Sequence, residues 1–144
     1  MGFRIDEDTI KSSLIISKNN MLLAFPIIKE NLLKEEEFKR VDREELENAT
    51  NFEELINAMR WDLKLDSHGN AISIYNHGVN VADEELLFNS IKDFVEDGSF
   101  VEYERQAYSS KQKERFDYKD KKVIQRTWVE NYDQNGNNFW DEIK

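Results

Sequence analysis

The chain contains few residues whose type and spacing point to catalysis or metal binding. The two histidines, His68 and His77, lie in or beside turns that bracket a predicted strand, and no third ligand stands at the spacing of a metal site. There is no cysteine, so a thiolate zinc site, a disulfide and a cysteine nucleophile are excluded. No glycine-rich phosphate loop and no Gly-x-Ser-x-Gly turn is present. The sequence therefore predicts no catalytic residue, no metal site and no cofactor.

One segment near the C-terminus has part of a calcium-loop pattern. Asp133, Asn135 and Asn137 stand at the 1-3-5 spacing of such a loop. A calcium loop would need its glycine two residues after Gly136, and a glutamate where this chain has Lys144. We therefore interpret the segment as a polar turn.

Clustered carboxylates are the chemical feature that stands out. Some of them crowd the end of a helix predicted over residues 84–95, where anions oppose the helix dipole by about 0.3–1 kcal/mol each when exposed. Others follow on one face of the next predicted strand. The cluster consists of Asp93, Glu96, Asp97, Glu102 and Glu104.

Two interpretations of this acidic cluster stay open. A basic hairpin further along the chain would neutralise it within the fold, through Arg115, Lys119, Lys121, Lys122 and Arg126. Alternatively, the cluster is retained to dock on a cationic surface, because local rules are often broken at functional sites.

Two aromatic residues near the C-terminus, Phe139 and Trp140, also have two interpretations. They fold back onto the sheet, or they are exposed anchors for a partner, since aromatic residues dominate binding hot spots.

The distribution of charge narrows the class of protein. The chain has 144 residues and a net charge of −10, from 30 acidic and 20 basic side chains. Residues 35–60 carry −5 and residues 61–110 carry −7, whereas each terminal segment carries +1. Such an excess disfavours nucleic acid and anionic membranes as partners, because both are polyanions. No apolar run approaches the roughly 20 residues of a membrane helix, and the N-terminus is acidic where a signal peptide would be basic. A cytoplasmic protein is therefore expected.

Apolar spacing predicts alternating strands and helices. Met21, Phe25, Ile28 and Leu32 share one helix face that continues across Pro26 without a phase shift, which predicts a kinked helix. The alternative is a hairpin, with the helix beginning at the proline.

Capping residues and period-2 alternation place the other elements. Three further helices are predicted. The first is a short turn that begins at Asp42, and the second covers residues 51–60 with Thr50 as its N-terminal cap. The third covers residues 84–95, with Asp83 as its N-terminal cap and Gly98 at its C-terminal end. The predicted strands are 11–17, 61–65, 72–75, 99–105, 113–119 and 122–129, with turns at 66–70 and Asp120–Lys121.

The order of these elements predicts an α+β fold. The first six main elements follow the β-α-(α)-β-β-α-β order of a ferredoxin-like sandwich, and a C-terminal β-hairpin is added. We expect a mostly antiparallel sheet with helices on one face. Residues 1–130 are predicted as a single domain and residues 131–144 as a polar C-terminal tail with aromatic anchors.

Two segments resemble a group of small, acidic, uncharacterised bacterial and phage proteins. Asp83 to Glu102 reads D-E-E-L-L-F-N-S-I-K-D-F-V-E-D-G-S-F-V-E. In that group a helix runs into F-V-E-D-G-S-[YF]-[IV]-E and then into an aromatic, charged hairpin. Trp61 to Ile74, W-D-L-K-L-D-S-H-G-N-A-I-S-I, is similar as well. The resemblance covers about residues 50–130, and the group's hairpin is richer in Trp than Arg115 to Lys119 here. It implies a fold and a phage or mobile-element setting, and it transfers no site.

Charge and resemblance together predict a non-enzymatic acidic binding protein. It would inhibit or sequester a basic protein that handles nucleic acid or serves host defence. One alternative is a small-ligand-binding or hydrolytic protein with a pocket between helix 84–95 and the sheet. Another is an antitoxin or immunity-type partner. The expected partner is a basic protein surface, with no direct nucleic acid and no membrane, and the expected contact residues are Asp93, Glu96, Asp97, Glu102, Glu104, Phe139 and Trp140.

Overall fold

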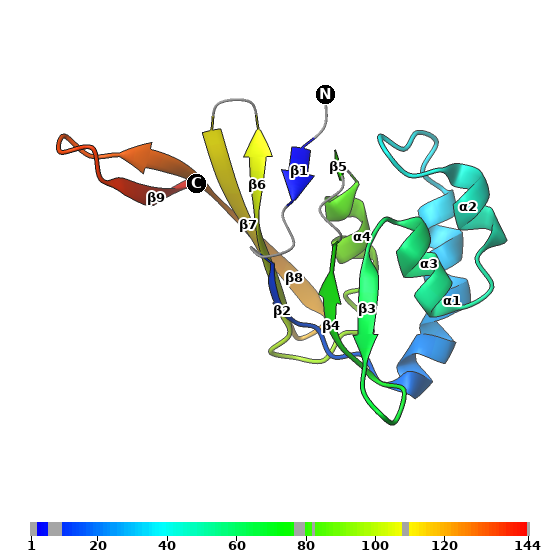
Figure 1. Ribbon diagram of the computed structural model, residues 1–144. Coiled ribbons are helices and arrows are strands. Elements are labelled where there is room, and N and C mark those ends of the chain that lie inside the picture. The colour runs from blue at the N-terminus through cyan, green and yellow to red at the C-terminus, as the bar shows by residue number, and fades with distance from the viewer. Residues whose placement is uncertain (1–2, 6–9, 77–79, 82, 108–109, 144) are drawn as a thin grey trace.

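The computed structural model describes residues 3–5, 10–76, 80–81, 83–107 and 110–143 (Figure 1). Helices and strands alternate along the described chain, and the strands pair antiparallel. The predicted α+β class is therefore confirmed.

One antiparallel sheet holds most of the described strands. Four consecutive strands form hairpins in sequence order: β6 (Phe100–Ala107), β7 (Ser110–Lys119), β8 (Lys122–Tyr132) and β9 (Asn138–Ile143). The other edge of β6 pairs with β2 (Lys11–Ser13) near its start and with β1 (Phe3–Ile5) near its end, and β1 also pairs with β5 (Asn80–Val81).

A second hairpin, β3 (Asp62–Leu65) and β4 (Ala71–Tyr75), forms a separate two-stranded sheet, and β4 lies beside β2 of the first sheet. An antiparallel bridge joins Ile16 to Ala71, and the Ser12 hydroxyl both donates to the Ile74 carbonyl (2.7 Å) and accepts from the Ile74 N–H (3.0 Å). The hydroxyl thus replaces a backbone partner where the two strands diverge. The spatial order β3–β4–β2–β6 places β4 between the ends of a split β-α-β connection, which confirms the predicted ferredoxin-like order.

The helices lie on one side of the sheet, and the β8–β9 arm projects away from them (Figure 1). They are α1 (Lys18–Leu33), α2 (Arg43–Asn48), α3 (Phe52–Ala58) and α4 (Glu84–Ser90). Helix α1 continues through Pro26, as predicted, and Asp42 caps α2 by accepting from the Glu44 N–H. The cap of α3 is Asn51 and not Thr50: the Asn51 side chain accepts from the Glu54 N–H at 2.8 Å.

Four aromatic rings fill the core between α4 and the β6–β7 hairpin. Trp61, Phe88, Tyr103 and Phe116 pack with centroid separations between 4.9 and 6.5 Å. All four residues are fully buried. These four side chains therefore pack across the interface between α4 and the sheet at which the alternative hypothesis places a small-ligand pocket.

The helix predicted over residues 84–95 is shorter than its apolar pattern suggests. Helix α4 ends at Ser90, and the chain continues in turns, with the Phe94 N–H donating to the Ile91 carbonyl. The Glu96 N–H then donates to the Ile15 carbonyl, beside β2. Apolar residues stay buried through these turns, so the periodicity outlasts the helix. Gly98 consequently does not end the helix; it lies in the turn before β6.

Other predicted boundaries also change. The strand predicted over 11–17 is regular only at β2, and neither β1 nor β5 was expected. Part of the predicted polar tail is strand β9, because residues 138–143 pair with β8. The predicted hairpin turn at Asp120 and Lys121 is confirmed, with φ of +54° and +59° at the two residues.

Two hairpin loops repeat one hydrogen-bond pattern. In D-S-H-G-N the Asp66 carboxylate accepts from the backbone N–H groups of residues 68 and 70. In D-Q-N-G-N the Asp133 carboxylate accepts from residues 135 and 137 in the same way. These bonds, with the Asn70 and Asn137 N–H groups first, lower the pKa of each aspartate. The segment with partial calcium-loop spacing is therefore a polar turn, as predicted.

Asp83 connects the start of α4 to the loop between α1 and α2. It precedes α4 with φ of +67° and makes no side-chain cap of that helix, contrary to the prediction. Its carboxylate instead accepts from the backbone N–H groups of Lys39, Arg40 and Val41, at 3.0–3.4 Å. This contact holds the loop that leads into α2.

We expect Asp83→Ala to destabilise the protein by about 2–3 kcal/mol, because three donors lose a charged acceptor. Asp83→Gly should cost about 1 kcal/mol less, since glycine adopts the positive φ without a Cβ penalty. Urea unfolding of both variants measures the difference. Equal losses would contradict the role of backbone strain at this position.

Candidate functional site

A large share of the negative charge of the described chain lies in one stretch that contains three helical segments. Residues 30–58, here called the acidic helical layer, span the end of α1, the loop after it, and helices α2 and α3. They contain ten carboxylates and four basic side chains, a net charge of −6. Every residue of this layer is described by the structure.

Few of these carboxylates are balanced within the layer. Arg43 and Glu47 form its ion pair, at 3.2 Å, and both side chains are exposed. Glu54 accepts from the Thr50 N–H and hydroxyl, each at 2.9 Å, and these bonds, the backbone one first, lower its pKa. Seven further carboxylates make no side-chain hydrogen bond or ion pair with the described residues: Glu30, Glu35, Glu36, Glu37, Glu44, Glu45 and Glu53.

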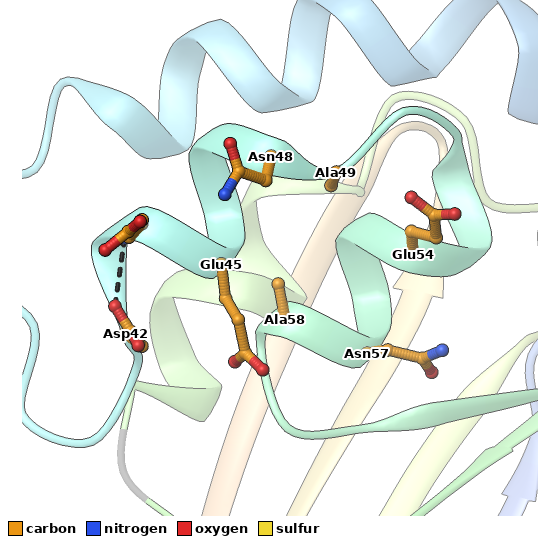
Figure 2. Close-up of a pocket in the computed structure, with 8 residues that line it drawn as sticks. Asp42, Glu45, Asn48, Ala49, Glu54, Asn57 and Ala58 are labelled. Atoms are coloured by element: carbon orange, nitrogen blue, oxygen red, sulfur yellow. Dashed lines mark hydrogen bonds between the residues drawn. The ribbon is translucent and has the colours of Figure 1, made fainter.

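A hollow of about 420 Å³ lies between α2 and α3 within this layer (Figure 2). Its polar lining includes Asp42, Glu45, Glu54 and Asn57. Figure 2 shows these side chains pointing in different directions from separate turns, without converging on one point. Among the described residues no group of three or more acidic or histidine side chains could hold a metal ion. The hollow therefore presents a spread negative surface to solvent.

The acidic cluster predicted from the sequence is divided by the structure. Glu102 lies across from Arg115 in the β6–β7 register, and the Arg115 Nη1 reaches its carboxylate at 3.4 Å. The Arg115 Nε also bonds Asp117 at 3.0 Å, and its guanidinium lies 4.2 Å from the Phe100 ring centroid. Glu104 faces Lys113 in the same register. The strand carboxylates thus lie beside cations of the neighbouring strand.

The other members of that cluster lie beyond α4. The expected conflict with the helix dipole is absent, because the helix ends at Ser90, before Asp93. Asp93 and Glu96 are exposed, and Asp97 accepts from the Asp120 N–H at 2.8 Å. Asp97 therefore supports the β7–β8 turn.

The two predicted aromatic anchors cannot act as one contact. Phe139 pairs with Asn131 and Trp140 with Glu130, and successive strand residues point to opposite faces. Trp140 is partly buried, and the Lys113 Nζ lies 5.0 Å from its ring centroid. Phe139 is 47% exposed on the other face.

A buried charged network links α4 to the sheet. Arg105 bonds Glu84 at 2.7 Å and also Glu114, and the Tyr103 hydroxyl donates to Glu114 at 2.8 Å. Burial raises the pKa of Glu84, and its second oxygen has no hydrogen-bond partner among the described residues. Burial and the Glu114 charge also raise the pKa of Tyr103. Sequence reasoning missed this network because Arg105 and Glu114 meet through the β6–β7 pairing and Glu84 reaches them from α4, and spacing within one segment shows neither contact.

The structure also bears on the expectations for the histidines and for a membrane helix. The His68 N–H donates to Asp66 in a hairpin turn, whereas His77 lies outside the described residues. No helix in the described part of the chain is long and apolar enough to cross a membrane.

Comparison with protein-family models, curated proteins and solved structures gives no match for this chain. Its function is therefore inferred from its own geometry.

Replacing Arg105 should expose the cost of the buried network. We expect Arg105→Met to destabilise the protein by about 3–5 kcal/mol, because two buried carboxylates would lose their common cation. Arg115→Met is the matched control on the neighbouring strand, with an expected loss of about 1 kcal/mol or less, since its partners are more exposed. Chemical denaturation of both variants measures the loss of unfolding free energy. Equal losses in the two variants would refute the role of Arg105 in stabilising the buried network.

The pH dependence of stability should report on Glu84. Its folded-state pKa is raised, so the stabilising contribution of its protonated form is complete below the unfolded pKa and is lost as the pH rises through the folded value. We expect wild-type stability to fall relative to Glu84→Gln as the pH rises above about 4.5. Denaturation curves across this window measure the difference. Glu85→Gln is the control, because Glu85 is exposed; its curve should run parallel to wild type.

Proposed function

We propose that this protein is a non-enzymatic binding protein whose acidic helical layer docks on a basic surface of another protein. The observation that carries the proposal is the group of seven exposed carboxylates in residues 30–58 that form no ion pair with any residue the structure describes. Unpaired surface charge of one sign steers association with a partner of opposite sign and disfavours wrong partners.

The contrast with the sheet supports this assignment of the surface. On the outer face of the sheet, cations and anions from adjacent strands meet, as at Arg126 and Glu142, 2.6 Å apart. Trp128 lies between two cations, with the Lys113 Nζ and the Arg126 guanidinium each 4.7 Å from its ring centroid. This face is balanced within the fold. The acidic helical layer, by contrast, has a net charge of −6 and few ion pairs among its described residues.

In the cell, the protein would bind the basic surface of a nucleic-acid-handling or host-defence protein, in a phage or mobile-element setting. An antitoxin or immunity role would use the same surface. A catalytic role gains less support, because the buried pair Glu84 and Glu114 is held by Arg105 within the packed core.

Two charge-reversal variants with the same change in net charge test the proposal. Glu44→Lys with Glu45→Lys alters the helical layer, and Asp93→Lys with Glu96→Lys alters the segment after α4. The immobilised proteins are used to capture partners from a lysate of the native host. We expect the first variant to lose a basic partner that wild type and the second variant both retain.

The retained complex should weaken as salt rises to about 0.5 M, because its attraction is between exposed charges. Capture that is equal for wild type and both variants, and insensitive to salt, would reject the proposal. Loss of the partner only with the second variant would move the site to Asp93 and Glu96.

A further inference from the structure

Helix α1 exposes apolar side chains that nothing in the described chain covers. Its buried side is formed by Met21, Ala24, Ile28 and Leu32. On the opposite side Leu22 is 68% exposed, Leu23 64% and Ile27 49%. A surface helix normally carries polar residues on its outer side. This exposed stripe therefore marks a contact surface.

Two hollows lie along α1 beside the stripe, of which Leu22 lines the first, and they share one wall. The first, of about 280 Å³, lies between α1, the start of α3 and the β3–β4 turn, and it is lined by Leu22, Phe25, Phe52 and Leu65 among others. The second, of about 530 Å³, follows α1 past Pro26 to Leu33. Phe25 lines both hollows. The surface can thus receive apolar side chains on either side of one aromatic ring.

The form of the surface favours a helical occupant. Helix α1 uses its backbone groups in its own hydrogen bonds, so it offers no unpaired edge to which an extended strand could add. A helix satisfies its own backbone and can set a ridge of side chains into the hollows of another helix. The 16 residues of α1 provide about 24 Å of length for such a contact.

The charge around the stripe selects the chemistry of the occupant. The hollows themselves are lined by lysines as well as carboxylates: Lys18 and Glu53 in the first, and Lys29, Glu30 and Lys34 in the second. The net negative charge lies beyond them, in the acidic helical layer on α2 and α3. A second copy of this chain would place another net charge of −6 beside the first. Like charges disfavour that arrangement, whereas a helix with lysine or arginine on its outer sides would be attracted.

We infer that the stripe on α1 binds a cationic amphipathic helix of the partner protein, with its apolar residues in the two hollows beside Phe25. This inference rests on the proposed function and specifies how the partner is held. The carboxylates attract the helix, and burial of Leu22, Leu23 and Ile27 holds it.

A defined probe tests the inference without knowledge of the natural partner. The probe is a fluorescent peptide of leucine and lysine, about 18 residues or 27 Å long as a helix, with leucines along one side. A peptide of the same composition, with leucines spread around the helix, is the control. Binding to the full-length protein is followed by anisotropy, and peptide helicity by circular dichroism.

Substitutions of exposed residues separate the apolar contact from the charge. Leu22→Ser, Leu23→Ser and Ile27→Ser are combined in one variant. Its matched control combines Ile124→Ser and Ile143→Ser, which are 60% and 53% exposed on the sheet. We expect the first variant to bind the probe at least about tenfold more weakly, and the control to bind like wild type.

Each other outcome overturns a stated part. Unchanged binding by the α1 variant, with weaker binding by Glu44→Lys and Glu45→Lys, would reject the inference and leave the proposed function standing. Weaker binding by the α1 variant alone would reject the charge-based function together with the cationic occupant. Equal binding of the spread-leucine peptide would reject a helical occupant.

Discussion

The placement of the helical layer depends on one buried guanidinium. Arg105 lies in the core between Glu84 of α4 and Glu114 of β7, with side-chain exposures of 12%, 8% and 6%. Removing three charges from water is costly, and the cost is offset only when their hydrogen bonds are oriented well. The network therefore tolerates little displacement of α4 along β6 and β7. Because Asp83 directly precedes Glu84, the same contact fixes the carboxylate that holds Lys39 to Val41. The position of α2, and with it the start of the acidic helical layer, follows from that chain of contacts.

Most of the fold could be predicted because apolar alternation and turn residues agree along the chain. The β3–β4 and β7–β8 hairpins have clear period-2 patterns between strong turns, so both were found. Strands β1 and β5 are only three and two residues long, and they exist because β6 offers them an edge. Strand β9 was missed for another reason. Its loop, D-Q-N-G-N, repeats the D-S-H-G-N loop that had been interpreted as a turn, but the strand after it mixes aromatic and acidic residues on both faces.

The candidate site was harder to predict because net charge along the sequence does not show which charges meet in space. The sequence shows an excess of negative charge in residues 35–60. It nevertheless favours the cluster around Glu102 as the contact surface, because that cluster is in apparent conflict with a helix dipole. That conflict depended on a helix reaching Val95, whereas α4 ends at Ser90. The pairing of Glu102 with Arg115 comes from cross-strand register, which residue spacing within one segment cannot reveal. Similarly, the helix pattern of α1 rested on the spacing of Met21, Phe25, Ile28 and Leu32, and it made no prediction for the apolar outer residues Leu22, Leu23 and Ile27.

The sheet and the helices differ in how their exposed aromatic, apolar and charged side chains are paired. On the sheet, cations lie over aromatic rings and beside carboxylates, so each feature has a complement in the neighbouring strand. On the helices, Lys29 lies over Phe25 and Arg43 pairs with Glu47, but Leu22 and Leu23 and most of the carboxylates of residues 30–58 have no such complement among the described residues. Water solvates carboxylates well but solvates Leu22 and Leu23 poorly. The apolar stripe on α1 therefore raises the free energy of the free protein, and a partner that covers the stripe would lower it.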